Sequence, residues 1–298
     1  MVPWLALNLL GGTDTRLGWR IVRRTFEMDI GLDEFFSMAP DRRAAQFPAE
    51  VAEICSDRLI KRVLADAEKL SAQLEEHGVT VLRSIDPGYP HSLTDVADDA
   101  VPPVLYISGN VDALYAKSIS IVGARSASQA GLDYAWSLAR MAADEGFVVV
   151  SGGATGIDSA AHRGAIDADG QTVVVLPHGV NHGKFQRVLD QHPGLVTLLS
   201  QFPPDQQPTA QTALARNRTI AGLSGTVVAV ESAATGGTMS TARYATQFSV
   251  PLFAVAWNDD APNHQGTATL ISEEQARPLP PIIAGPEDLD HLFAAARI

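Results

Sequence analysis

Apolar residues in the first part of the chain recur every three to four positions, which is the spacing of amphipathic helices. The last such stretch begins at Ser56, a favourable N-cap residue, and stops at Gly78, which suits the position after a helix end. The expected helices cover residues 15–26, 37–54 and 56–78, and a short strand should follow at 79–83. The glycine-bounded segment LGGTDTRLG predicts a turn between helices. We therefore expect a small all-helical domain, of the SAM or helix-hairpin kind, over residues 1–84.

Beyond residue 84, short runs of Val, Ile and Leu alternate with helical spacing. VPPVLYISGN predicts an edge strand, and the later strands are SISIVG, FVVVSGG, QTVVVLP, LVTLLSQF, TVVAVES and PLFAVAW. Apolar strands separated by helices are typical of a parallel sheet covered on both faces. The tail SEEQARPLPPIIAGPEDLDHLF predicts a Pro-rich connector and a short helix. We predict an α/β fold over residues 85–298, an extended Rossmann-like, doubly wound, mainly parallel sheet.

Composition limits where such a protein works and what it binds. The chain has 298 residues and one cysteine, Cys55, which excludes an intrachain disulfide and fits a reducing compartment. The apolar start MVPWLALNLL is too short to span a bilayer. We expect a cytoplasmic protein without membrane contact. The net charge of −12 argues against a broad basic surface for nucleic acid. Any site for a polyanion must therefore be local.

The candidate chemistry lies in the loops that follow the strands. In a parallel sheet these loops converge at one edge, where ligands bind. One loop, GGATGID, offers close backbone approach and a helix N-terminus to an anion. The arginines of ARNRTIAGLS could clamp a phosphate. The candidate residues are Arg125, Ser151, Gly152, Gly153, Gly156, Arg216, Asn217, Arg218, Gly236, Gly237 and Thr238.

Several polar residues allow more than one interpretation. Asp158 could simply cap a helix, and His162 could pack on the sheet or pair with Asp158. Glu231 could act as a general base or orient Arg216 or Arg218. The patterns G-x-G-x-x-G and Walker A are absent, and the spacing of the histidines in the connection from 178 to 192 fits no zinc site. We therefore expect no cofactor and no metal. Tyr89 and Trp136 are expected in the core.

Five segments resemble motifs of the DNA-processing protein A (DprA, or Smf) family: VGARSAS, VVSGGATGIDSAAHRGAI, RNRTIAGLSGTVVAVES, GGTMSTARYA and GTATLI. The resemblance spans nearly the whole chain. It implies a homodimer that binds single-stranded DNA and helps load the recombinase RecA in natural transformation, without catalysis. The residues that would contact phosphates are Arg125, Gly153, Arg216, Asn217 and Arg218, with Lys184. Such groups grip the backbone without reading bases.

The sequence departs from the family pattern at several positions. Ala124 replaces a serine, Ala213 a phenylalanine, Ala215 an arginine and Gln201 a glutamate. No C-terminal winged helix is expected after Trp257. These differences, together with the net charge, leave two alternatives open.

One alternative is a nucleotide-sensing module, because a small ligand needs fewer cations than a strand. The other is a phosphoribohydrolase of the LOG type. That family shares the motif GG-x-GT-x-x-E, and Thr241 stands where its catalytic glutamate would be.

Overall fold

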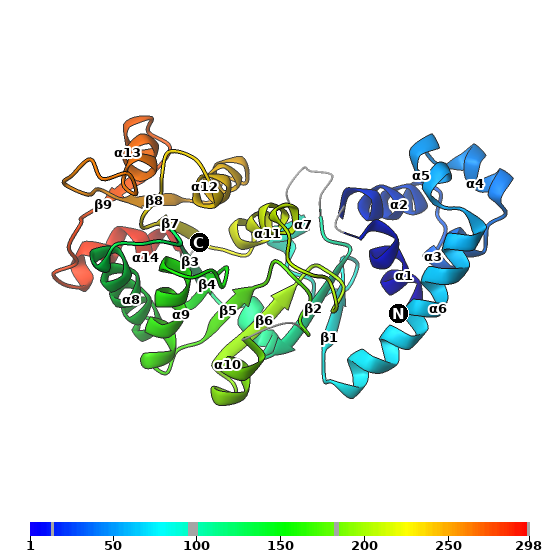
Figure 1. The fold of residues 1–298 in the computed structure, drawn as a ribbon, viewed down its shortest axis with the longest axis horizontal. Helices are drawn as coiled ribbons and strands as arrows, with labels where there is room; N and C mark the ends of the chain where they lie inside the picture. The colour runs from blue at the N-terminus through cyan, green and yellow to red at the C-terminus, as the bar shows by residue number, and fades with distance from the viewer. Residues whose placement is uncertain (13–14, 95–100, 182–184, 297–298) are drawn as a thin grey trace.

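The computed structural model describes residues 1–12, 15–94, 101–181 and 185–296 (Figure 1). These residues form a nine-stranded sheet with the order β1-β2-β6-β5-β4-β3-β7-β8-β9. The strands from β6 to β9 in this order pair in parallel, whereas β2 is antiparallel to both β1 and β6. The bounds are β1 Thr80–Arg83, β2 Val104–Gly109, β3 Ser118–Val122, β4 Val148–Ser151, β5 Thr172–Val175, β6 Val196–Ser200, β7 Thr226–Ala229, β8 Leu252–Val255 and β9 Arg277–Leu279. The predicted mainly parallel α/β sheet is confirmed.

Helices cover both faces of this sheet, as a doubly wound fold requires. In β4, Val149 packs with the helices of one face, while Val148 and Val150 pack with those of the other. The first face carries α8 Gln129–Asp144, α9 Ile157–Asp167 and α14 Asp290–Ala296. The second carries α7 His91–Thr94, α11 Ala210–Gly222, α12 Gly237–Gln247 and α13 Gln265–Ser272. Figure 1 shows α8, α9 and α14 below the strands and α11 and α12 above them.

The N-terminal helices pack against the sheet and share its core. They are α1 Val2–Gly11, α2 Thr15–Glu27, α3 Leu32–Ser37, α4 Pro40–Gln46, α5 Ala49–Ile54 and α6 Asp57–Glu76. Leu5, Leu7 and Ile21 belong to the same apolar cluster as Tyr106 and Leu198 of the sheet. The helices therefore pack mainly against one another, and their apolar cluster continues onto these strands.

Local signals for the ends of helices are met in the structure. The Ser56 hydroxyl accepts a hydrogen bond from Leu59 N at 3.4 Å, and Gly78 has a φ of +63°. The helix predicted over 37–54 is instead divided into two short ones, α4 and α5, and Ser37 is the last residue of α3. Pro40 begins α4 and Pro48 directly precedes α5, because proline suits the first turn of a helix and disrupts its interior.

Other expectations need correction. β2 is not an edge strand, because it lies between β1 and β6. β1 forms the edge, so the sheet begins before residue 85. The Pro-rich tail contributes β9, whose Leu279 is buried beside Val255. The connection after β5 contains a helix, α10 Phe185–Gln191. None of the helices that the structure describes is long and apolar enough to cross a membrane.

Candidate functional site

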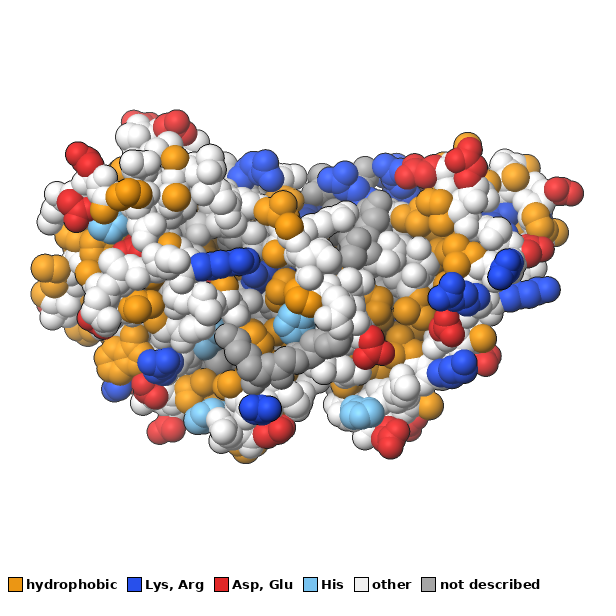
Figure 2. Space-filling view, viewed as in Figure 1, with side chains coloured by type: hydrophobic (Ala, Val, Ile, Leu, Met, Phe, Trp, Pro, Cys, Tyr) orange, Lys and Arg blue, Asp and Glu red, His pale blue; other side chains and the backbone are white. Residues whose placement is uncertain are grey.

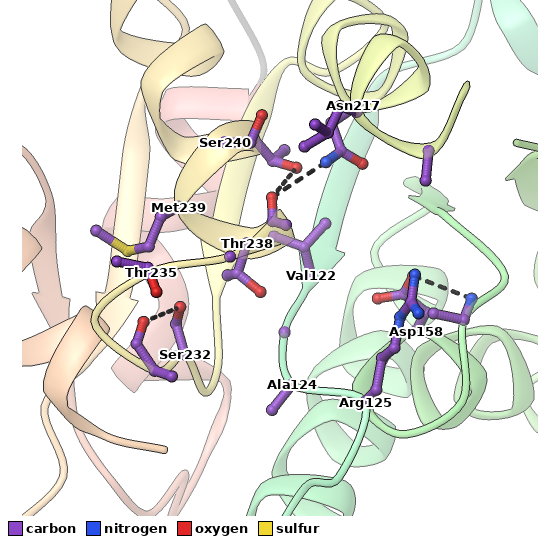
Figure 3. Close-up of a pocket in the computed structure, with 18 of the residues that line it drawn as sticks. Val122, Ala124, Arg125, Asp158, Asn217, Ser232, Thr235, Thr238, Met239 and Ser240 are labelled. Carbon is purple, nitrogen blue, oxygen red and sulfur yellow. Dashed lines mark hydrogen bonds between the residues drawn. The ribbon is translucent and has the colours of Figure 1, made fainter. Parts of the chain in front are cut away.

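A cleft of about 1340 Å³ opens at the carboxyl ends of β3 and β7 (Figure 3). From β3 the chain continues to β4, β5 and β6 on one side of the sheet, and then crosses to β7 on the other side. The order of strands thus reverses between β3 and β7, and open α/β sheets bind ligands at such a reversal because the connecting loops diverge there. The walls are the loop after β3, the loop after β7, and helices α11 and α12.

About half of the predicted residues line this cleft: Arg125, Arg216, Asn217, Gly236, Gly237 and Thr238. Five others are not among the lining residues: Ser151, Gly152, Gly153, Gly156 and Arg218. Lys184 lies outside the residues that the structure describes. The topology therefore brings the arginines of two separate segments, the loop after β3 and helix α11, to one site. The glycines after β4 do not line this site.

Arg216 reaches the cleft from the interior of the protein, since only 5% of it is exposed. Its Nη1 donates to the carbonyl of Val175 at 2.9 Å. Burial lowers the pKa of Arg216 to about 10, and the carboxylate of Asp158 partly opposes this shift. The guanidinium consequently keeps its charge at neutral pH. It can offer that charge to an anion at low solvent exposure, where charges interact strongly.

Asp158 is the carboxylate that compensates Arg216. Burial raises the pKa of its carboxyl group, while the charge of Arg216 and the backbone N–H of Ala154 lower it. The Ala154 N–H donates to Asp158 Oδ2 at 3.2 Å. Asp158 lies in the first turn of α9. Helix capping and pairing with His162 do not describe its role fully, because its carboxylate accepts from a backbone N–H and also balances a buried cation.

The glycines after β4 shape the site without lining it. A Cβ on Gly152 would lie 1.6 Å from Nη1 of Arg216, so the guanidinium occupies the space that a side chain would fill. A Cβ on Gly156 would lie 2.2 Å from the carbonyl of Ala124, and its φ is +81°. Ser151 is fully buried and donates to the carbonyl of Ile121 at 2.6 Å. These residues hold the strand ends together beneath the cleft.

Arg218 occupies a different side of α11 from Asn217. Its guanidinium lies 5.1 Å from the ring centre of Phe248, and only 6% of the residue is exposed. Asn217 instead donates through Nδ2 to the carbonyl of Gly237 at 3.2 Å, which ties α11 to the start of α12 (Figure 3). Arg216 and Asn217 line the cleft, whereas Arg218 is not among the lining residues.

The first turn of α12 presents backbone donors to the cleft. Gly236 is the N-cap residue with a φ of +133°, and both it and Gly237 are exposed. The N-terminal N–H groups of a helix have no partner within the helix and carry a partial positive charge. An anion in the cleft can accept hydrogen bonds from them.

The cleft is locally basic although the whole chain is acidic. Among the described residues that line it, the cations are Arg125, Arg216 and Arg243, and the carboxylate is Asp158. In Figure 2, Lys and Arg side chains gather over the loops that follow β3 and β4 and over α12, which surround the cleft. Arg243 was not among the residues predicted from the sequence. It lies in α12, which begins at the predicted Gly237, and this position was the signal that could have identified it.

Apolar side chains also line the cleft. Leu214, on α11, lines it and is 51% exposed, which is unusual for a large aliphatic side chain. Ala213, Pro208 and Met239 also line the cleft. A ligand that carries both anionic groups and flat apolar surfaces matches this lining.

The remaining polar candidates have structural roles. Glu231 is fully buried and accepts from Ser128 N at 3.0 Å, so it neither faces the cleft as a base nor orients the arginines of α11. His162 packs on the sheet and contacts Thr172 Oγ1 through Nδ1 at 2.7 Å. Tyr89 is buried as expected. Trp136 is only half-buried, because its Nε1 reaches Asp167 at the edge of the α8–α9 packing.

Comparison with known proteins identifies the family. The family model described as "DNA recombination-mediator protein A" matches residues 80–284, more than half of the chain. The chain belongs to this family. It is 30% identical over 242 residues to Protein Smf of Synechocystis, covering 73% of this chain and 59% of that protein. It is also 32% identical over 191 residues to Protein Smf of Escherichia coli, covering 62% and 50%. The chain thus matches only half to three fifths of the length of these two relatives.

Solved structures of the family share the fold. DNA processing protein A from Streptococcus pneumoniae superposes with a TM-score of 0.77 and 23% identity, covering 97% of this chain and 96% of that one. DNA processing protein A from Helicobacter pylori, whose structure describes a single-stranded DNA binding mode, superposes with a TM-score of 0.62 and 25% identity. That match covers 72% of this chain and 95% of the other.

Proposed function

We propose that this chain binds single-stranded DNA in the cleft between α11 and α12, as a non-catalytic recombination mediator. The observation that carries the proposal is the grouping of Arg125, Arg216 and Arg243 with the first turn of α12 around one cleft. Its volume of about 1340 Å³ exceeds the usual range for small-molecule sites, roughly 300–1,000 Å³, and suits a segment of polymer. Arginines and backbone N–H groups hold phosphates without reading bases.

The apolar wall supports a strand with unpaired bases rather than a duplex. In single-stranded DNA the base faces are accessible and can pack on Leu214 while the phosphates meet the arginines. Three cations predict a modest dependence on salt, with a slope of about −2 in the logarithm of affinity against the logarithm of salt concentration. The net charge of −12 adds long-range repulsion, so binding should be measured at low salt.

The test is fluorescence anisotropy with labelled oligo-dT, from low to moderate salt. The variant Arg125→Glu/Arg243→Glu reverses two exposed cations and should weaken binding at least tenfold. Arg62→Glu is the matched control, because Arg62 is exposed on α6, away from the cleft. Equal affinities for the unaltered protein and the double variant would refute the proposed site.

Partners follow from the family and belong to the same proposal. We infer that the protein acts as a homodimer and delivers its strand to the recombinase RecA. Light scattering coupled to size exclusion would measure the dimer. Stimulation of RecA filament formation on DNA covered by single-strand binding protein would measure delivery.

Hydrolysis of a nucleotide has less support. Thr241, at the position of the LOG-type glutamate, is 2% exposed and donates to the carbonyl of Gly237 at 3.3 Å. A threonine provides no acid–base group for cleavage of an N-glycosidic bond. The carboxylate that does line the cleft, Asp158, is paired with Arg216. Release of a free base from a nucleoside monophosphate would contradict this part of the proposal.

The small-nucleotide alternative is tested by thermal shift. A strand bound along the cleft predicts stabilisation by oligo-dT and little effect of mononucleotides at equal phosphate concentration.

A further inference from the structure

The loop that carries Arg125 is fastened to the segments after β7 and β8. Ala124 N donates to the carbonyl of Glu231 at 2.9 Å, and Ser128 N donates to the Glu231 carboxylate at 3.0 Å. Asn263 Nδ2 donates to the carbonyl of Ser126 at 2.7 Å. Arg125 is itself exposed, so these contacts on both sides determine where its backbone lies.

His264 lies between the residues that make these hydrogen bonds, since it contacts Glu231 and follows Asn263 in the chain. Its Nε2 is 3.3 Å from Oε1 of Glu231, and its Nδ1 contacts Oδ1 of Asp259. The ring is stacked on Trp257, with centres 4.7 Å apart and planes 12° apart. Only 6% of His264 is exposed. His264 directly follows Asn263 in the chain. The position of His264 is therefore linked to the hydrogen bond between Asn263 and Ser126.

The carboxylates of Glu231 and Asp259 favour the protonated, positively charged form of the His264 ring. A neutral imidazole has one N–H and one acceptor nitrogen, whereas an ionised carboxylate only accepts. Both ring nitrogens face carboxylates here, so both hydrogen bonds form only when the ring is an imidazolium. Glu231 contacts the His264 ring from the segment that follows β7. Asp259 contacts it from the same loop that carries His264. The other neighbours, Trp257 after β8 and Ser128 at the start of α8, are uncharged.

We propose that His264 is a positioning residue for Arg125, which as an imidazolium between Glu231 and Asp259 fastens the loop of residues 123–128 and strengthens DNA binding at lower pH. The inference rests on the proposed function of the cleft. Loss of the proton leaves one ring nitrogen facing a carboxylate without a hydrogen bond. The hydrogen bond from Asn263 to the carbonyl of Ser126 then weakens. The loop that carries Arg125 becomes less ordered, and ordering it on DNA binding reduces the affinity.

The experiment measures the affinity for oligo-dT between pH 6 and 8.5 at constant low salt, where neither thymine nor the phosphodiester titrates. The unaltered protein should lose about fivefold in affinity across the titration of His264, the effect of one ordinary hydrogen bond. His264→Gln cannot become a cation. It should show a flat profile at the weaker, high-pH affinity.

Asp259→Asn provides the sharper variant, because the Asp259 side chain is 66% exposed and its loss should leave the fold intact. Removing this anion takes away the acceptor that Nδ1 of the charged ring contacts, so the midpoint of the affinity profile should move to lower pH. The titration of His264 followed by NMR without DNA should move by the same amount. His77→Gln is the control, since His77 is exposed at the end of α6.

The outcomes separate this inference from the proposed function. If the unaltered protein binds oligo-dT with no pH dependence, or if Asp259→Asn shifts the NMR titration but not the affinity profile, the positioning role is wrong and the site stands. If the unaltered protein does not bind oligo-dT at any pH, the proposed function fails and this inference fails with it.

Discussion

At the scale of single residues, the site depends on a position that carries no side chain. Gly152 was predicted to contact phosphate through its backbone, yet it lies behind the cleft and leaves room for the Arg216 guanidinium. The same guanidinium is balanced by Asp158, so a glycine and an aspartate of the segment after β4 and an arginine of α11 form one unit.

Gly152→Ala should displace the guanidinium of Arg216, because the new Cβ would lie 1.6 Å from Nη1. The loss of a charge-assisted contact should weaken oligo-dT binding by about tenfold or more. Anisotropy titration measures the effect. Gly31→Ala is the matched control, since a Cβ there meets its first neighbour only at 3.9 Å. An unchanged affinity for Gly152→Ala would show that Arg216 does not hold DNA.

Cys55 supplies a prediction about pH. It is 2% exposed, and burial raises the pKa of its thiol from 9.0 to about 11. A raised pKa favours the folded state while the thiol stays protonated. Its contribution is therefore complete below pH 9 and lost as the pH rises through 11. Urea unfolding should show a steeper loss of stability over this range for the unaltered protein than for Cys55→Ala. Equal slopes would contradict the assignment.

At the scale of elements, α11 combines two functions along its length. Ala210, Ala213, Asn217 and Ile220 recur at helical spacing and line the cleft, with Leu214 exposed beside them. Thr219, further along, donates to the Gln201 side chain in the interior. The helix thus fixes its buried end in the core and offers its first turns to a ligand. The capping box of Thr209 and Thr212 stabilises that first turn.

Leu214→Ala should weaken binding of oligo-dT about fivefold and leave binding of an abasic strand of equal length unchanged, because Leu214 would pack against bases. Leu214→Trp should strengthen binding of oligo-dT, an effect that no folding defect can produce. Ile85→Ala is the control, since Ile85 is exposed outside the cleft. Equal losses on both strands would place Leu214 away from the bases.

At the scale of the whole molecule, buried contacts join the helical N-terminal part to the sheet. The Tyr106 hydroxyl, in β2, donates to Asn8 Oδ1 of α1 at 2.9 Å. Asn8 Nδ2 donates in turn to the carbonyl of Gln201, just after β6, at 3.3 Å. Both contacts are buried within the apolar cluster that α1 shares with the sheet. Unfolding of the helices would therefore expose core residues of the sheet.

Tyr106→Phe should lower the free energy of unfolding by about 1–3 kcal/mol, because it leaves the buried Asn8 oxygen without its donor. The denaturation curve should keep a single transition. Tyr115→Phe is the matched control. Tyr115 is 52% exposed, and removal of its hydroxyl hydrogen bond should cost less than about 0.5 kcal/mol. Two separate transitions would show that the helical part folds alone.

Features that depend on neighbouring residues could be predicted from the sequence. The N-cap Ser56, the strands from β3 to β8 and the family motifs all follow from local spacing and local chemistry. The three-residue β9 could not be predicted in this way. Its Pro-rich segment has no strand pattern, and it becomes a strand by pairing with β8.

The sequence by itself therefore determined the α/β class, the family and the two arginine-bearing segments that meet at the cleft. Only the tertiary structure decided which side chains face it. Arg216 and Arg243 line the cleft, whereas Arg218 lies against Phe248 and Glu231 holds the Arg125 loop. The physical reason is that periodicity follows from local backbone geometry, whereas burial and charge pairing depend on segments far apart in the chain.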